Sequence, residues 1–304
     1  MEEDRLKQAI EVGKASQDAI VSASRLVKPG ARLLDVAEAA EKALRQSGFG
    51  LAFPINLSQN ERAAHYSPSL EDQTTFSERD IVKIDFGAEK NGVLGDGALT
   101  IDLSGEHGKM VEAAEKALDN AISMVKAGIE VRKIGAEIAR TVESAGFKVI
   151  LNLGGHGIEE NDLHTGSFIP NYDNGDSDVL EDGAIIAIEP FITTKSGKGQ
   201  VTEGDNMEIY SYVGGAVPRT PGARKVLHEI ESKYPKNPFA VRWLGSGMSR
   251  FSLYSAISEL SKTGCISVNP VLIEMGRAPV AQAEAELLVE KDSCKVITLA
   301  KRTG

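Results

Sequence analysis

The chain has 304 residues, of which 41% are hydrophobic and 26% are charged. This length allows one large domain or two ordinary ones, and the composition excludes a disordered chain. The 34 Lys and Arg residues are outnumbered by 44 Asp and Glu residues, which gives a net charge of −10. An acidic surface of this kind argues against nucleic acid as the main ligand.

The start of the chain, MEEDRLK, lacks the basic and apolar segments of an export signal. No apolar run approaches the roughly 20 residues that a membrane span requires. The two cysteines, Cys265 and Cys294, are too few for a disulfide framework or a structural zinc site. We therefore expect no membrane contact and a cytoplasmic location.

Helices and strands alternate in groups along the first two-thirds of the chain. Apolar residues at helical spacing predict helices over residues 6–27, 33–44, 108–126 and 131–144. Runs of β-branched and apolar residues predict strands over residues 81–87, 92–103, 148–153, 184–188, 200–202 and 207–213. The tripeptide Lys90-Asn91-Gly92 between the first two of these strands is a strong hairpin signal.

The two halves of this region resemble each other. Without a gap, Lys28, Gly30, Val36, Leu44, Gly48 and Phe49 align with Lys126, Gly128, Ile134, Val142, Gly146 and Phe147. The strand sequence IVKID then resembles IIAIE, and His65 and His164 fall at similar places. A chance similarity is the alternative to an internal duplication. Paired helices that lead into antiparallel strands predict an α+β fold, with helices packed on one face of a sheet.

Residues 217–275 do not fit the repeat and contain the single tryptophan, Trp243. Between Arg219 and Arg250 there are seven basic residues and two acidic ones. We interpret this segment as an inserted helical subdomain. The catalytic domain would then cover residues 1–216, and residues 276–304 would complete it. The basic residues favour a solvated helix face, and an RNA-rich partner is the alternative.

Asp85 and Asp96 lie on the two arms of the predicted hairpin. A loop with an even number of residues places both side chains on one face, because side chains alternate along a strand. A Lys90-Asn91 loop would set them directly opposite and an Asn91-Gly92 loop diagonally, roughly 4.5–8 Å apart. Two solvated aspartates are the simplest alternative. If they are buried, their mutual repulsion predicts a metal ion between them.

The second half adds side chains of the same kind. Glu189 ends the apolar run AIIAIEPF, where a buried charge needs a partner. His156 follows a predicted strand on a glycine-rich bend, from which its ring can point inward, although a buried core histidine is the alternative. The segment AQAEAELLVEKD places Gln282, Glu284 and Glu286 on one strand face, unless these glutamates face solvent. Carboxylates with one imidazole suit two divalent ions of the Mn, Fe, Co or Zn type.

Six motifs occur in the order FPINLSQNERAAHYSP, VKIDFG, GDGALT, NLGGHGIEENDLHTGSFIPN, AIIAIEPF and VAQAEAELLVEKD. With them the chain resembles the archaeal type II methionine aminopeptidases over nearly its whole length. The resemblance includes the inserted subdomain that separates type II from type I. It implies the pita-bread fold, with two halves related by a pseudo-twofold axis, a dinuclear metal site between them and a winged-helix-like insert.

The resemblance assigns the metal ligands residue by residue. It implies that Asp85 binds one ion, that His156 and Glu189 bind the other, and that the remaining two carboxylates, Asp96 and Glu284, bridge both. The two ions would activate a water molecule as the hydroxide nucleophile. We expect Glu189 to relay a proton as well.

The resemblance also assigns substrate contacts. His65 and His164 correspond to family histidines around the scissile bond, and Phe53 corresponds to a wall of the methionine pocket. The implied activity is removal of the N-terminal methionine from nascent proteins. The implied partners are nascent chains that begin with Met, and the ribosome, and we expect a monomer.

Two other functions fit the same fold. An Xaa-Pro dipeptidase would share all five ligands, but such enzymes usually carry an additional N-terminal domain. A non-catalytic pita-bread adaptor that binds the ribosome or RNA would tend to lose ligands and gain basic tails. In this chain all five positions are filled and the chain is acidic, which argues against the adaptor.

The chain departs from the family pattern at two places. The family usually has Gln-Phe-Glu-His at the last ligand, where this chain has Gln282-Ala283-Glu284-Ala285. Glu286 has the same strand parity as Glu284 and is therefore a rival for the ligand position. We expect the missing bulk to widen the substrate pocket. Gly97 stands where a larger residue is common, and we expect it to loosen the hairpin.

Overall fold

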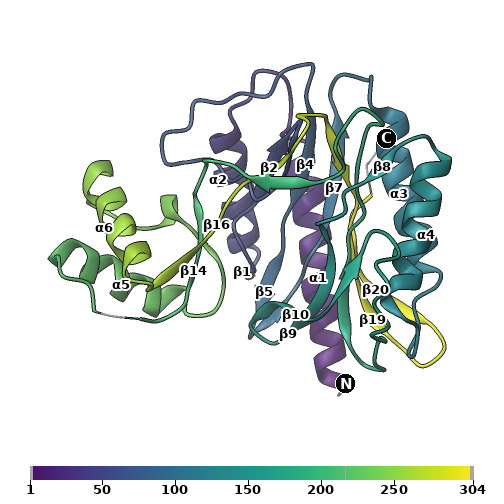
Figure 1. Ribbon diagram of the computed structural model, residues 1–304. Coiled ribbons are helices and arrows are strands. Elements are labelled where there is room, and N and C mark those ends of the chain that lie inside the picture. The colour runs from purple at the N-terminus through teal and green to yellow at the C-terminus, as the bar shows by residue number, and fades with distance from the viewer. Residues whose placement is uncertain (1–2, 216, 302–304) are drawn as a thin grey trace.

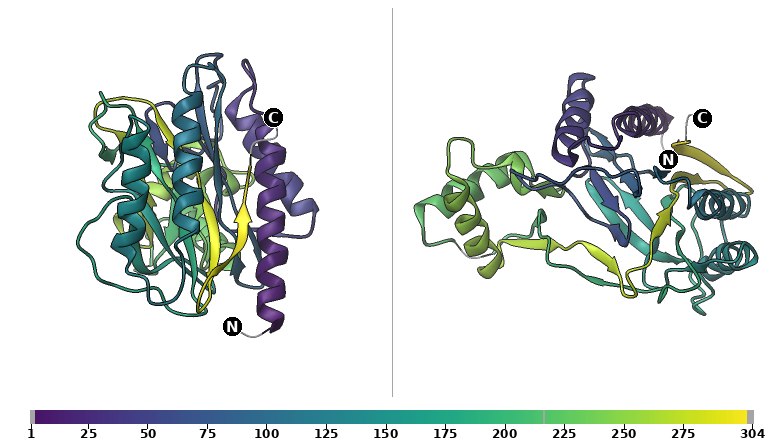
Figure 2. Two further views of the ribbon diagram at one scale, coloured as in Figure 1. Left: turned by 90° about the vertical axis from the view of Figure 1, so that its right-hand side faces the viewer. Right: turned by 90° about the horizontal axis from the view of Figure 1, so that it is seen from above.

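The computed structural model describes residues 3–215 and 217–301, which form a layered body and a smaller lobe (Figure 1). The helices are α1 (Glu3–Ser24), α2 (Leu33–Gln46), α3 (Gly108–Ile122), α4 (Val131–Ser144), α5 (Pro221–Lys233) and α6 (Arg250–Lys262). Seen from above, α1 to α4 lie outside the strands of the body, and α5 and α6 belong to the lobe (Figure 2). None of the described helices is long and apolar enough to cross a membrane.

Within the described residues, the first half contains seven short strands. They are β1 (Gly50–Leu51), β2 (Asn56–Gln59), β3 (Arg62–Ala64), β4 (Ile81–Asp85), β5 (Ala88–Lys90), β6 (Val93–Leu94) and β7 (Ala98–Asp102). β2 and β7 both pair with β4 in antiparallel fashion. β5 and β6 form the tip of the predicted hairpin, and the strands of this hairpin are interrupted at residues 86–87 and 95–97.

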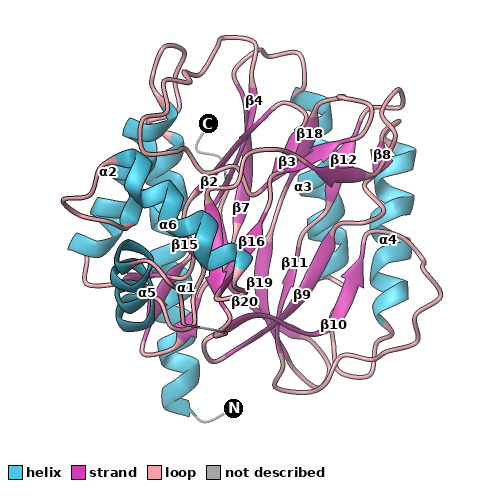
Figure 3. Cartoon of the chain, turned by 60° about the vertical axis from the view of Figure 1, so that its left-hand side comes forward, coloured by secondary structure: helices cyan, strands magenta, loops and turns pink. Residues whose placement is uncertain are grey.

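The remaining described strands of the body form three sheets, one of which includes β3. They are β8 (Lys148–Val149), β9 (Gly154–Glu159), β10 (Asp162–Pro170), β11 (Ile185–Ile188), β12 (Phe191–Thr193), β13 (Val201–Glu203), β17 (Leu272–Glu274), β18 (Val280–Gln282), β19 (Ala285–Val289) and β20 (Cys294–Leu299). β9, β11, β19 and β20 are consecutive neighbours in a five-stranded sheet that begins with β10. The C-terminal strands therefore complete the sheet of the second half (Figure 3).

The duplication is visible in the backbone. α2 and α4 each have 14 residues. Before them Gly30 and Gly128 have φ angles of 85° and 79°, a region that glycine enters without steric cost. The N–H of Gly30 donates to the carbonyl of Phe76, and the N–H of Gly128 donates in the same way to the carbonyl of Leu180. These matched turns confirm the predicted α+β fold with an internal repeat.

The lobe contains α5, α6 and a three-stranded sheet of β14 (Ile209–Tyr212), β15 (Phe239–Ala240) and β16 (Ile266–Asn269). It has its own cluster of buried apolar side chains, including Val226, Phe239 and Leu260. The two helices begin at N-capping hydroxyls, Thr220 for α5 and Ser249 for α6. β14 pairs with β16, so the chain enters and leaves the lobe on neighbouring strands. The winged-helix-like arrangement of this lobe stays a prediction.

One buried ion pair fastens the lobe to the body. Arg242, in the short 3₁₀ helix Val241–Trp243, donates to the carboxylate of Glu41 on α2. The other oxygen of Glu41 accepts from the indole N–H of Trp243 at 2.8 Å. Arg242 also donates to the hydroxyl of Ser67 at 2.8 Å. This segment therefore supplies the cation and the indole N–H that face the buried carboxylate of Glu41.

Candidate metal centre

The first pair of carboxylates comes from the interrupted hairpin. Its loop is Asn91-Gly92, with φ angles of 52° and 80°, which suits a two-residue turn. Asp85 ends β4 opposite Ala98, and Asp96 lies two residues before Ala98. The two aspartates are therefore diagonal neighbours, which is one of the two arrangements that the sequence predicted. Asp96 is buried in the break between β6 and β7.

His156 lies within β9, opposite Ala187 of β11. The prediction that it follows a strand on a glycine-rich bend is wrong. A Cβ atom at Gly155 would lie 2.1 Å from the carbonyl oxygen of Ala187. The glycine beside His156 therefore lets two strands approach closely rather than turning the chain. Glu189 follows the last residue of β11.

Glu284 lies in the break between β18 and β19 and is buried. The segment from Gln282 to Glu286 is thus two strands rather than the single strand that the sequence predicted. Asp96, His156 and Glu284 each offer a ligand atom, and these atoms lie within 4.8 Å of one another. Glu286 lies outside this group. Its Oε2 accepts from the backbone N–H of Asp96 and from the hydroxyl of Thr298, and its buried Oε1 has no hydrogen-bond partner among the described residues.

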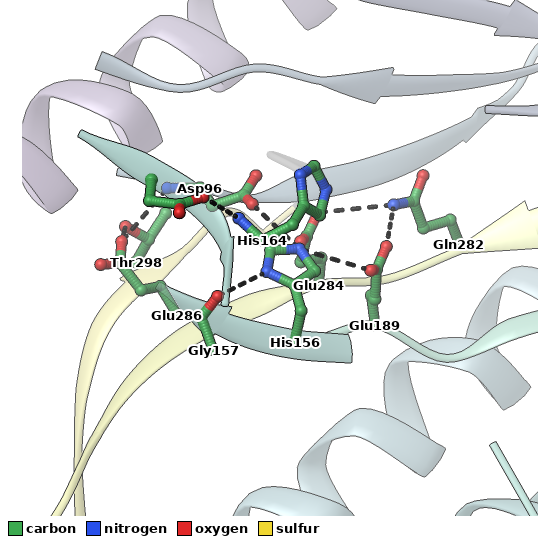
Figure 4. A network of polar contacts seen from close by, with 10 residues as sticks. Asp96, His156, Gly157, His164, Glu189, Gln282, Glu284, Glu286 and Thr298 are labelled. Atoms are coloured by element: carbon green, nitrogen blue, oxygen red, sulfur yellow. Dashed lines mark hydrogen bonds and ion pairs between the residues drawn. The ribbon is translucent and has the colours of Figure 1, made fainter. Parts of the chain in front are cut away.

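The distances between these atoms suit ligands of a shared ion (Figure 4). Nε2 of His156 lies 3.6 Å from Oδ2 of Asp96 and 3.7 Å from Oε1 of Glu189. Both separations are too long for hydrogen bonds. Ligand atoms that each lie about 2.0–2.2 Å from one ion come to about 3–4 Å from each other. In addition, the buried Oδ1 of Asp85 has no hydrogen-bond partner among the described residues.

The buried carboxylates of the cluster favour bound cations, because their charges have no cationic partner nearby in the described part of the chain. No lysine or arginine in residues 3–215 or 217–301 forms a salt bridge with the five carboxylates Asp85, Asp96, Glu189, Glu284 and Glu286. Burial raises the pKa of Asp85 to about 7 and that of Glu286 to about 8. Burial, followed by the charges of Asp85 and Asp96, also raises the pKa of Glu189.

His156 has the protonation state that metal binding requires. Burial and the neighbouring His164 lower the pKa of His156 to about 3, so its imidazole is neutral. Its Nδ1 lies 3.1 Å from the carbonyl oxygen of Gly157, which leaves Nε2 to face the carboxylates. Gln282 donates weakly to Glu189 and Glu284, at 3.3 and 3.4 Å. Four carboxylates and a neutral imidazole therefore fit a pair of divalent ions.

A cavity of about 400 Å³ opens onto this cluster. Its walls include all eight side chains that the sequence singled out as ligands or substrate contacts: Phe53, His65, Asp85, Asp96, His156, His164, Glu189 and Glu284. Residues separated by more than two hundred positions thus meet around one space of the size that small ligands occupy.

The two further histidines occupy the cavity wall. His65 directly follows β3 and has a φ angle of 62°. Its Nδ1 lies 3.2 Å from the carbonyl oxygen of Pro270, and burial lowers its pKa to about 4. His164 lies on β10 with its ring centroid 4.3 Å from that of His156. Both imidazoles therefore stand beside the proposed ligands without belonging to the ligand cluster.

Parts of the wall were not predicted from the sequence. Ser211 of β14, Asn269 of β16 and Leu272 of β17 line the cavity from the strands on either side of the lobe. Nothing in their local sequence distinguishes them from other strand residues. Ala283 and Ala285, in contrast, do not line it, because they belong to the core packed against α3 and α4. The expected widening of the substrate pocket is therefore wrong.

A recessed set of carboxylates with one neutral imidazole, placed beside two more histidines, indicates a metal-dependent hydrolase. The model of metallopeptidase family M24 matches residues 4–211. A methionine aminopeptidase of Pyrococcus horikoshii is 42% identical, over 98% of this chain and all of its own. That of Methanocaldococcus jannaschii is 37% identical with the same coverage. The chain belongs to metallopeptidase family M24 and, within it, to the methionine aminopeptidases.

Solved structures share the fold. A thermophilic Arx1 superposes with a TM-score of 0.84 at 17% identity, covering 98% of this chain and 91% of its own. The methionine aminopeptidase of Thermotoga maritima gives 0.71 at 23% identity and 98% coverage of both chains. The prolidase of Pyrococcus horikoshii gives 0.63 at 16% identity, and covers 99% of this chain but 63% of its own. These similarities confirm the pita-bread fold.

Proposed function

We propose that this protein removes the N-terminal methionine from nascent proteins by hydrolysis at a dinuclear metal centre. The observation that carries the proposal is the convergence of the five ligand-type side chains in one cavity of a chain about 40% identical to methionine aminopeptidases. Asp85 would hold one ion, His156 and Glu189 would hold the other, and Asp96 and Glu284 would be shared by both. The two ions are divalent and of the Co, Mn, Fe or Zn type.

When bound, the ions supply Lewis acidity and an activated water molecule. The chain's own groups do the remaining work. Glu189 lines the cavity beside His156, from where it can relay a proton to the leaving amine. His164 donates a hydrogen bond to the oxygen of the scissile carbonyl. The Nδ1–H of His65 is used by the carbonyl of Pro270, so its Nε2 accepts a hydrogen bond near the scissile nitrogen. The neutral imidazole of His65 suits a hydrogen-bonding role rather than that of a charged partner.

The methionine side chain lies against Phe53. This phenylalanine packs with Leu163, Leu94 and Ile158 in a small apolar cluster beside the cavity, and both Phe53 and Leu163 line the cavity. An unbranched thioether fills such a slot and makes favourable contacts between its sulfur and an aromatic ring. The apolar wall thus supports methionine at the first position of the substrate.

We propose the domain division at residues 1–216, 217–275 and 276–304. Two observations support it. The lobe has its own apolar core, and the match to the family model ends at residue 211. Neither Cys265 nor Cys294 is in a disulfide, which suits the reducing cytoplasm in which nascent chains are made. A monomer that acts on chains at the ribosome completes the proposal.

The test combines elemental analysis with N-terminal release from the peptides Met-Ala-Ser, Leu-Ala-Ser and Ala-Pro. We expect close to two divalent ions per chain and release of methionine from Met-Ala-Ser alone. Cleavage of Ala-Pro instead would make the protein an Xaa-Pro dipeptidase. Metal-loaded protein that cleaves none of the three peptides would favour a non-catalytic adaptor.

A further inference from the structure

Glu286 is a fully buried carboxylate next to the proposed metal centre. Its Oε2 accepts two hydrogen bonds, from the backbone N–H of Asp96 and from the hydroxyl of Thr298, both at 3.1 Å. Figure 4 shows Glu286 and Thr298 on one side of Asp96 and Glu189 on the other. One oxygen atom therefore connects the backbone of a proposed ligand to strand β20.

Asp96 lies between β6 and β7, at a position of the hairpin that carries no cross-hairpin hydrogen bond among the described residues. The residues on either side of it do carry one, because the N–H of Gly95 donates to Ala88 and the N–H of Phe86 donates to Gly97. N–H groups along an antiparallel strand point alternately toward and away from the partner strand, so the N–H of Asp96 points out of the hairpin, where it donates to Glu286. Glu286 therefore satisfies the backbone donor of Asp96 on the side that the hairpin partner does not reach.

Gly97 makes room for the second member of this contact. Thr298 is fully buried on β20, directly across from Glu286 in the β19–β20 pairing. A Cβ atom at position 97 would lie 2.8 Å from Cγ2 of Thr298, closer than real Cβ contacts come. The absence of a side chain at Gly97 therefore does not leave a gap. The threonine methyl fills that space, and its hydroxyl holds Glu286.

We propose that Glu286 is a positioning residue, which Thr298 orients and which holds Asp96 where it can bridge two metal ions. The inference rests on the proposed metal centre. It also accounts for one departure of this sequence, because Thr298, which holds Glu286, occupies the space that a larger side chain at position 97 would need. On this proposal the contacts of Thr298 and Glu286 stabilise the hairpin at Asp96, in contrast to the loosening that Gly97 alone led us to expect.

The test measures Mn²⁺ binding to metal-free protein by titration calorimetry, with the melting temperature recorded for each variant. Glu286→Leu removes the acceptor, and we expect it to weaken Mn²⁺ binding about 10–100-fold. Glu286→Gln keeps a carbonyl acceptor for the N–H of Asp96, and we expect it to restore most of the affinity. Thr298→Val should weaken binding less than Glu286→Leu does, and Thr298→Ser should bind as the wild type does.

The matched control is Thr193→Val. Thr193 is another fully buried strand threonine, whose hydroxyl donates to the carbonyl of Pro279. Its loss should lower the melting temperature and leave Mn²⁺ affinity unchanged, which separates positioning from general stability. If Glu286→Leu does not fold, the Thr298→Val and Thr298→Ser pair decides the question.

Two results would overturn the inference while leaving the metal centre intact. One is wild-type Mn²⁺ affinity in both Glu286→Leu and Thr298→Val. The other is an equal loss in Glu286→Gln and Glu286→Leu, which would assign the effect to charge or direct ligation. If the wild-type protein itself bound no Mn²⁺, that result would contradict the proposed metal centre and therefore also this inference.

Discussion

Nε2 of His156 lies 3.6 Å from Oδ2 of Asp96, although the two side chains come from opposite halves of the duplicated chain. Asp96 belongs to the first half with Asp85, and His156 belongs to the second half with Glu189. Neither half therefore holds the proposed ligand set alone. An ion between these atoms would join the halves as well as serve the reaction, so metal binding and folding stability are linked.

This linkage predicts an unusual result for Glu284→Gln. Burial, Asp96 and Glu189 raise the pKa of Glu284, because its negative charge is unfavourable without cations. We therefore expect the metal-free variant to melt above the metal-free wild type, by about 2–4 °C for each kcal/mol of repulsion relieved. We also expect it to lose the rise in melting temperature that Mn²⁺ gives the wild type. Scanning calorimetry with and without Mn²⁺ measures both.

Glu274→Gln is the matched control for that prediction. Glu274 is also fully buried, but its oxygens accept from the backbone N–H groups of Lys198, Gly199, Gly276 and Ala278. Loss of its charge should lower stability with or without metal. A Glu284→Gln variant that melted below the wild type and kept its response to Mn²⁺ would argue against the metal centre.

His65→Asn should separate turnover from metal binding. His65 has a φ angle of 62°, and asparagine is one of the residues that tolerate this region, so the backbone should be kept. Loss of the imidazole hydrogen bond to substrate should lower kcat on the order of 10²–10³-fold, with Mn²⁺ affinity unchanged. Peptide hydrolysis and calorimetry on the same sample test the two parts. A loss of bound metal would show that His65 has been given the wrong role.

Glu208→Gln should change how stability depends on pH. Burial raises the pKa of Glu208 to about 7, against the opposing effects of its hydrogen bond from Tyr254 and of Arg242 and Arg250. A raised pKa means that the folded protein holds this proton more tightly, so stability falls as pH rises from about 4.5 through about 7. The variant should match the wild type near pH 4.5 and exceed it by on the order of 2–3 kcal/mol at pH 8.

Urea unfolding at the two pH values measures this difference. Glu231→Gln is the control, because Glu231 accepts from Tyr212 at 3.0 Å in an analogous pair that lies exposed on the lobe. It should leave the pH dependence of the wild type unchanged. An effect of Glu208→Gln that is the same at both pH values would contradict the prediction.

The ion pair between Arg242 of the lobe and Glu41 of the body should contribute to the free energy of unfolding through its charges. Arg242→Met leaves Glu41 buried without its cation, and we expect a loss of about 3–5 kcal/mol in the free energy of unfolding. The double variant Glu41→Gln with Arg242→Met should recover most of it, because glutamine still accepts from Trp243. Denaturant unfolding of the two single variants and the double variant tests this. Equal losses in Arg242→Met and the double variant would mean that packing, not charge, holds the joint.

Much of the centre could be predicted from local patterns. Period-two alternation placed Asp85 and Asp96 on one face, and it left open only which two residues form the loop. The repeat of Gly30 and Gly128 marked equivalent turns, because a positive φ angle constrains the residue type wherever it occurs. Each of these inferences depended on a constraint that acts over a few residues.

The rest depended on contacts between distant segments. The sequence alone cannot distinguish a glycine at a bend from a glycine that lets a neighbouring strand approach. The position of Ala187 shows that the glycine beside His156 is of the second kind. Ser211 and Asn269 reach the cavity because β14 and β16 pair next to it, which no local pattern records. The break in the strand before Ala285 likewise arises because β18 pairs with β12 while β19 pairs with β11.

The contact between Gly97 and Thr298 makes these two positions interdependent. A side chain at position 97 and a threonine methyl at position 298 compete for the same space. A larger residue introduced at position 97 alone would clash with Thr298. The two positions can therefore be varied in the laboratory only as a pair, with a smaller residue at 298 accompanying any larger one at 97.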